Sequence, residues 1–150
     1  MTTIAFRDGI LASDSLASYG ETKVPGDMQK LFRLRDGSAA GVTGSEGEWR
    51  RVIAWLDGDR GAPQPQPIGE NRSSVIVLHI DGTIEIFEDG YHFTESSKFM
   101  AWGSGQPAAL GALHAGMSAA DAVRIATMVD KSSGGAVQTM RPEPKLAVVA

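Results

Sequence analysis

Short apolar runs separated by turn residues fill the first third of the chain, a pattern typical of β-hairpins. The runs 3–6 and 10–13 flank Asp8-Gly9, and glycine tolerates the positive φ that a tight hairpin turn requires. A polar stretch punctuated by Gly and Pro follows over residues 18–26. We expect the first two strands to pair, and a second hairpin to form from 28–34 and 38–44, ending at Gly44.

The spacing of apolar residues changes to that of an amphipathic helix after Ser45, whose side chain is of the kind that caps helix N-termini. Four apolar residues then recur at helical intervals: Trp49, Val52, Ile53 and Leu56. This helix is expected to end at Asp57-Gly58. The segment 61–67 has proline at alternate positions, which removes amide donors, and we expect it to be a surface loop.

The second half of the sequence predicts further strands around two helices. A two-residue hairpin turn is expected at Asp81-Gly82, and the helices are expected from Pro107 to about Gly116 and from Ser118 to Val129. The strands are predicted at 74–80, 83–87, 98–102, 136–140 and 146–150. The order strands, helix, strands, two helices, strands predicts one α+β domain over residues 1–150, built as a four-layer αββα sandwich of two antiparallel sheets between helix layers.

Composition narrows the possible chemistry. The chain has no cysteine, which excludes disulfide scaffolds, thiolate zinc sites and cysteine nucleophiles. Its net charge of −4, without a long Lys/Arg run, argues against nucleic acid as a partner. No apolar stretch approaches the roughly 20 residues that cross a bilayer, and no secretion signal opens the chain, so we expect a cytoplasmic protein without a membrane partner. The three histidines, His79, His92 and His114, are not spaced as a metal site.

The second residue brings a candidate nucleophile. Removal of Met1 would leave Thr2 with a hydroxyl group and an α-amine on the same residue. Such an amine titrates at about pH 7.7 to 8.0 and can accept the hydroxyl proton at neutral pH. The small side chain of Thr2 suits removal of Met1 by a cellular aminopeptidase.

Several separated segments resemble the proteasome β-subunit and bacterial HslV peptidase branch of the N-terminal nucleophile (Ntn) hydrolases, and the resemblance spans nearly the whole chain. No single segment is diagnostic, but their order and spacing together are specific. The segments are Thr2-Thr3-Ile4, Ala12-Ser13-Asp14-Ser15-Leu16-Ala17-Ser18, Gln29-Lys30-Leu31, Ala40-Gly41-Val42-Thr43-Gly44, Gly103-Ser104-Gly105 and Asp130-Lys131-Ser132-Ser133-Gly134-Gly135.

The resemblance implies that Thr2 attacks the scissile carbonyl, forms an acyl-enzyme ester and is released by water, with its own amine relaying protons. Lys30 would lower the energy of the alkoxide-like state and keep the amine neutral, and Asp14 would hold Lys30 charged. The backbone N–H of Gly44 would point into the oxyanion hole. Three more polar residues would surround the threonine amine: Ser104, Asp130 and Ser133.

The same resemblance implies where a substrate binds. The backbone of Ser18 would pair with an extended peptide, as an added strand. Four residues would surround the first specificity pocket: Ala17, Met28, Val42 and Glu46. Because this pocket would be small and apolar apart from Glu46, we expect a preference for apolar or basic side chains.

The sequence therefore predicts a threonine-type Ntn peptidase that cleaves peptides or unfolded proteins. The resemblance further implies a homo-oligomeric ring and an ATP-dependent unfoldase as partner, and the acyl transfer needs no metal or organic cofactor. Two alternatives stay open. One is an Ntn amidohydrolase of a small amide, and the other is a non-catalytic assembly or structural relative that retains Met1.

Overall fold

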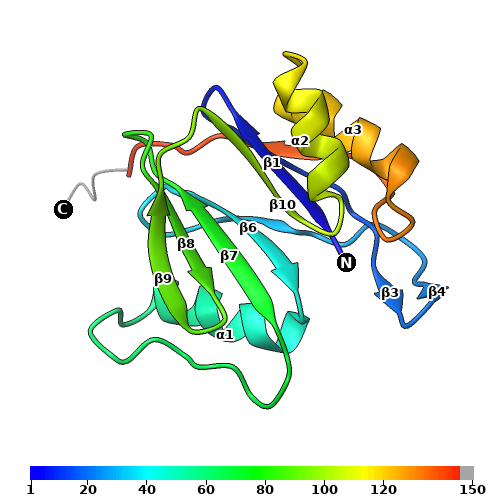
Figure 1. The fold of residues 1–150 in the computed structure, drawn as a ribbon. Coiled ribbons are helices and arrows are strands. Elements are labelled where there is room, and N and C mark those ends of the chain that lie inside the picture. The colour runs from blue at the N-terminus through cyan, green and yellow to red at the C-terminus, as the bar shows by residue number, and fades with distance from the viewer. Residues whose placement is uncertain (146–150) are drawn as a thin grey trace.

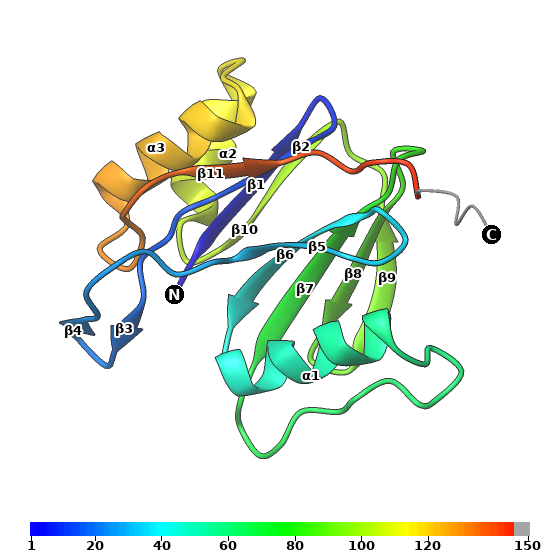
Figure 2. The same ribbon diagram turned by 180° about the vertical axis from the view of Figure 1, so that it is seen from behind.

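A computed structural model describes residues 1–145 of the chain. Two antiparallel sheets face each other, and the helices of the described residues lie on their outer sides (Figures 1 and 2). The predicted α+β class is therefore confirmed. No helix within residues 1–145 combines the length and the apolar run that a membrane crossing needs.

The first sheet has the strand order β10-β1-β2-β11. Its strands, in that order, are Phe99–Gly103, Thr3–Arg7, Ile10–Ser13 and Gln138–Met140. The hairpin of β1 and β2 forms as predicted, because Asp8 and Gly9 both take positive φ values, 52° and 72°. The sheet thereby brings the beginning of β1, directly after Thr2, beside the end of β10.

The second sheet has the order β5-β6-β7-β8-β9. Its strands are Leu31–Arg33, Ala39–Gly44, Ser73–Leu78, Ile84–Glu88 and Tyr91–Glu95. The predicted two-residue turn at Asp81-Gly82 is wrong: the His79 N–H donates to the Thr83 carbonyl at 2.9 Å, which leaves a three-residue turn. Gly82 takes a φ of 90° there, as the last residue of such turns does.

The three predicted helices are present as α1 (Glu46–Asp57), α2 (Gln106–His114) and α3 (Ala119–Val129). Ser118 caps α3 by accepting a hydrogen bond from the Asp121 N–H at 3.1 Å. Ser45 precedes α1 at the N-cap position, but its side chain makes no capping hydrogen bond. Helix α1 packs on β6 and β7, whereas α2 and α3 pack on the outer face of the first sheet.

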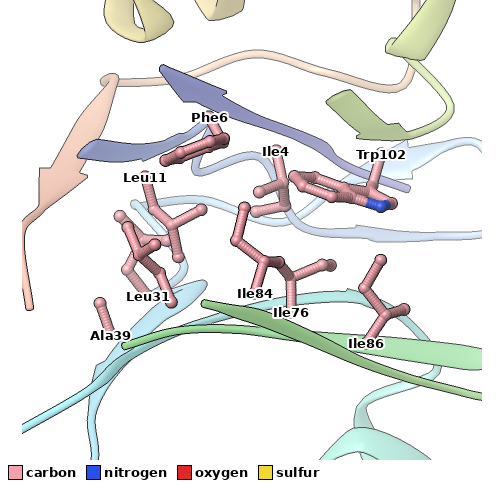
Figure 3. Close-up of a cluster of buried hydrophobic side chains, with 10 residues drawn as sticks. Ile4, Phe6, Leu11, Leu31, Ala39, Ile76, Ile84, Ile86 and Trp102 are labelled. Atoms are coloured by element: carbon pink, nitrogen blue, oxygen red, sulfur yellow. The ribbon is translucent and has the colours of Figure 1, made fainter. Parts of the chain in front are cut away.

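Buried apolar side chains form three clusters, one between the two sheets and one between each sheet and its helices. The cluster between the sheets includes Ile4, Leu11 and Trp102 from the first sheet and Ile76 and Ile86 from the second (Figure 3). A cluster rich in alanine joins α2 and α3 to the first sheet, and small side chains permit this close approach. A third cluster places Trp49 of α1 against the second sheet. Both sheets thus have buried residues on both faces, whereas the edge strand β9 is mostly exposed.

Two further differences from the predictions are strands that were not expected, and one predicted strand falls outside the described residues. The polar stretch 18–26 contains a small hairpin of β3 (Ser18–Tyr19) and β4 (Thr22–Lys23), and strand β9 was not predicted. The expected strand 146–150 lies outside the described residues. The segment 61–67 is mostly exposed and has no regular secondary structure, as the prolines predict.

Candidate active site

A buried ion pair lies beside the peptide bond that joins Met1 to Thr2. Lys30, directly before β5, places its Nζ 2.9 Å from Asp14 Oδ1, and the two side chains are 3 % and 0 % exposed. The same Nζ donates to the Met1 carbonyl at 3.1 Å. Burial lowers the pKa of Lys30, and the Asp14 carboxylate partly opposes this shift. The structure thus brings Thr2, Asp14 and Lys30 together, as the resemblance implies.

Asp14 is held in place by backbone donors from three segments. Its Oδ1 also accepts from the Thr3 N–H at 3.0 Å, and its Oδ2 accepts from the N–H groups of Gly134 at 3.0 Å and Leu16 at 3.3 Å. These hydrogen bonds stabilise the ionised carboxylate and fix the position of Lys30. The sequence alone does not show these backbone contacts.

A second polar cluster lies on the other side of β1. Asp130, at the C-terminal end of α3, accepts hydrogen bonds at Oδ2 from the hydroxyls of Ser104 and Ser133, each at 2.6 Å. Ser104 Oγ is also 3.3 Å from the Thr2 carbonyl oxygen. Although burial raises the pKa of Asp130, the hydrogen bonds from these two serines hold it below its ordinary value. The chain's amino terminus also acts on Asp130 in the same direction.

Thr3 joins the two clusters, and the sequence reasoning assigned it no role. Its N–H donates to Asp14, and its Oγ1 lies 2.7 Å from Ser133 Oγ. Thr3 has no solvent exposure. The signal in the sequence was its position directly after Thr2, which places it at the start of β1.

Gly44 ends β6 and leads into α1. Its φ is 87°, and a Cβ at this position would lie 2.4 Å from the Arg72 carbonyl oxygen. Only glycine fits this close approach without strain. Gly44 is also exposed, and it lies directly before the N-cap of α1. The dipole of this helix gives positive potential at that end.

A cleft of about 480 Å³ opens beside these groups. Thr2, Lys30 and Gly44 lie along it, and so do all five residues predicted to contact substrate: Ala17, Ser18, Met28, Val42 and Glu46. The sequence reasoning missed other residues of the lining, among them Asp27 and Trp49. Two carboxylates, those of Asp27 and Glu46, thus belong to a lining that combines apolar side chains with other polar ones.

The histidines lie elsewhere. His79 Nε2 and His92 Nε2 contact the two oxygens of Glu85 at 2.6 Å and 3.0 Å. His114 packs its ring against Phe99. Within residues 1–145, no group of three or more histidine and carboxylate side chains has the geometry to hold a metal ion.

Comparison with known proteins supports the fold of this chain. No family model matches the sequence, and no curated protein matches it either. Among solved structures, Thiobacillus denitrificans BPH aligns with a TM-score of 0.69 at 24 % identity, covering 95 % of this chain and 98 % of that one. Thiobacillus denitrificans BPH in complex with epoxomicin aligns with a TM-score of 0.63 at 23 % identity, covering 95 % and 99 %. The chain shares the fold of BPH over nearly its full length.

Proposed function

We propose that this protein is a threonine-type N-terminal nucleophile peptidase that acts through Thr2 after removal of Met1. The observation that carries the proposal is the buried pair of Lys30 and Asp14, whose ammonium group lies at the peptide bond before Thr2. Burying two charges costs free energy. Buried charged groups with shifted pKa values beside a cleft are therefore candidates for a functional site.

The reaction would follow from the groups around Thr2. The free amine of Thr2 takes the proton of its own hydroxyl, and the oxygen attacks the scissile carbonyl. The backbone N–H of Gly44 stabilises the oxyanion, and the Lys30 ammonium stabilises the negative charge near Thr2. Collapse of this intermediate breaks the peptide bond, and the protonated amine gives its proton to the leaving amine. Water, activated by the same amine, then hydrolyses the ester.

Removal of Met1 has a direct consequence for Lys30. The Met1 carbonyl is an acceptor of the Lys30 ammonium, so its loss frees one donor position of Nζ toward Thr2. Met1 itself is 67 % exposed, and an aminopeptidase requires such access. The new amine of Thr2 would be close enough to interact electrostatically with Asp130, as the amino terminus of Met1 does when it lowers the pKa of Asp130.

The fold supports this proposal. We propose that the order helix α1, second sheet, first sheet, helices α2 and α3 is the αββα arrangement of the Ntn hydrolases. The matching BPH structure was solved with epoxomicin, a proteasome inhibitor. An epoxyketone directed at N-terminal threonine is therefore a suitable probe for this chain.

Hydrolysis of fluorogenic peptides tests the proposal. The wild-type protein is expected to cleave peptides, Thr2→Ser to keep part of the activity, and Thr2→Ala to lose it, because alanine has no nucleophile. A panel of small amides is assayed in parallel. Cleavage of the small amides without cleavage of the peptides would identify an amidohydrolase. Peptide hydrolysis that persists undiminished in Thr2→Ala would contradict the proposed role of Thr2.

We also propose that the chain assembles into a homo-oligomeric ring that receives unfolded substrates from an ATP-dependent unfoldase. This part rests on the resemblance to the proteasome β-subunit and HslV. Light scattering on the purified protein is expected to give a mass several times that of one chain. A monomeric mass would contradict the ring.

A further inference from the structure

We propose that Thr3 is a positioning residue, whose hydroxyl orients Ser133 and, through it, the Asp130 carboxylate. The proposal rests on the proposed function, since it concerns the same site. Thr3 follows the candidate nucleophile and is fully buried, so it contacts no substrate. It acts through its neighbours.

The direction of the hydrogen bonds follows from the charge of Asp130. An ionised carboxylate can only accept hydrogen bonds, so Ser133 donates its one hydroxyl proton to Asp130 Oδ2, at 2.6 Å. The 2.7 Å contact between Thr3 Oγ1 and Ser133 Oγ then has Thr3 as the donor. The result is a directed chain from Thr3 through Ser133 to Asp130, in which each hydroxyl fixes the orientation of the next.

The position of the Thr3 hydroxyl is itself fixed by packing. A Cβ placed on Gly105 would lie 1.8 Å from Thr3 Oγ1, so the hydroxyl occupies the space that the missing side chain leaves. The Thr3 N–H is held at 3.0 Å by Asp14, which also binds Lys30. One residue therefore couples the two polar clusters on either side of Thr2.

Loss of the hydroxyl alone would leave the Ser133 hydroxyl held only by its hydrogen bond to Asp130, with no donor to its own oxygen from Thr3. Ser133 is only 5 % exposed, so water has little access to replace the lost donor. The hydrogen bond from Ser133 to Asp130 would then be less well fixed in direction, which would leave the carboxylate less well oriented toward the amine of Thr2. Because Thr3 is buried and is not itself one of the residues that line the cleft, this change is expected in kcat and not in KM.

Thr3→Val and Thr3→Ser separate the hydroxyl from the rest of the side chain. We expect Thr3→Val to lower kcat for peptide hydrolysis about tenfold, the factor that corresponds to one buried hydrogen bond of about 1.4 kcal/mol. KM should stay within about twofold, and Thr3→Ser should restore kcat. The matched control is Ser38→Ala, which removes another buried hydroxyl bonded to a carboxylate, that of Asp36, at the opposite end of β6 from Gly44. Unchanged kcat in Thr3→Val, or an equal loss in Thr3→Ser, overturns the proposal.

A double-mutant cycle tests whether Thr3 acts through Ser133. Thr3→Val combined with Ser133→Ala should lose no more kcat than Ser133→Ala alone, because both remove the same connection. Multiplied losses would show independent roles and overturn the proposal. If thermal unfolding shows that valine prevents folding, Thr3→Ala takes its place in both comparisons.

A measurement without turnover separates this proposal from the proposed function. The pKa of Asp130, followed by carboxyl ¹³C NMR, should rise in Thr3→Val, because the Ser133 hydrogen bond that lowers it is no longer held. It should stay unchanged in Thr3→Ser and Ser38→Ala. A wild-type protein without hydrolase activity would refute the proposed function, whereas an unshifted Asp130 pKa in Thr3→Val would refute the positioning role of Thr3.

Discussion

Replacing Asp14 by Asn keeps the shape of a fully buried side chain and removes the charge that faces Lys30. The two Asp14 oxygens accept four hydrogen bonds, one from the Lys30 ammonium and three from backbone N–H groups. An asparagine offers one acceptor oxygen and presents an NH₂ group to the other donors. Leaving a buried charge without its partner costs about 3 to 5 kcal/mol. This is a large part of the roughly 5 to 15 kcal/mol that keeps a domain folded.

Urea unfolding at two pH values measures this cost. In Asp14→Asn the attraction that raises the pKa of Lys30 is gone, so its folded-state pKa falls further below the ordinary value of 10.5. The penalty for the buried ammonium is full below that folded pKa and is relieved as the pH rises toward the unfolded value. The stability gap between wild type and Asp14→Asn should therefore narrow as the pH is raised from neutral toward 10.5.

Asp14→Asn combined with Lys30→Met is the matched control, because it removes the charge that Asp14→Asn leaves unpaired. Its unfolding free energy should return to within about 2 kcal/mol of the wild type. Peptide hydrolysis should stay lost, since both charged groups are absent. A cost below about 1 kcal/mol for Asp14→Asn, as for exposed ion pairs, would contradict a buried charge left without its partner. So would a double variant no more stable than the single one.

Three further changes have expected outcomes. Gly44→Ala places a Cβ 2.4 Å from a backbone carbonyl oxygen at a φ of 87°, and urea unfolding should show a loss of about 2 kcal/mol or more; a smaller loss than about 0.5 kcal/mol would contradict the close approach. Although burial raises the pKa of Glu85, hydrogen bonds from His79 and Arg60 hold it below its ordinary 4.5, so its stabilisation is full above that value and lost as the pH falls through the folded pKa. Thermal unfolding of Glu85→Gln should thus show a loss of about 1 kcal/mol at neutral pH that becomes smaller as the pH falls below 4.5, and a loss that does not change with pH would refute this. Glu46→Arg should lower the rate for peptides with a basic residue before the cut about fivefold relative to apolar ones, and an unchanged ratio in the fluorogenic panel would exclude Glu46 from the specificity pocket.

The local signals of the sequence predicted most of the secondary structure. Turn residues that tolerate positive φ predict the hairpin at Asp8-Gly9, and helical spacing predicts the three helices. Both signals are local, because they depend only on residues close together in the sequence. Strand β9 was missed because its residues are mostly exposed and show no buried face. The turn before it has the same signal as the first hairpin, since Asp89 and Gly90 take φ values of 50° and 84°. An Asp-Gly pair directly after a predicted strand would have indicated it.

The candidate site depends on contacts that no local pattern contains. Asp14 and Lys30 stand in separate segments, and only the packing of the two sheets buries them together. Their selection came from a resemblance spread over the whole chain, and the geometry brings them together as the resemblance implies. Thr3 was overlooked because a threonine in a strand is ordinary. Its hydrogen bond to Ser133 joins residues 130 positions apart, which only the fold brings together.

Intact-mass spectrometry of the purified protein after incubation with epoxomicin shows whether Thr2 becomes an N-terminal nucleophile. We expect a molecule that lacks Met1 and carries one covalent adduct, and a Thr2→Ala variant that carries none. A protein that retains Met1 and forms no adduct would contradict it.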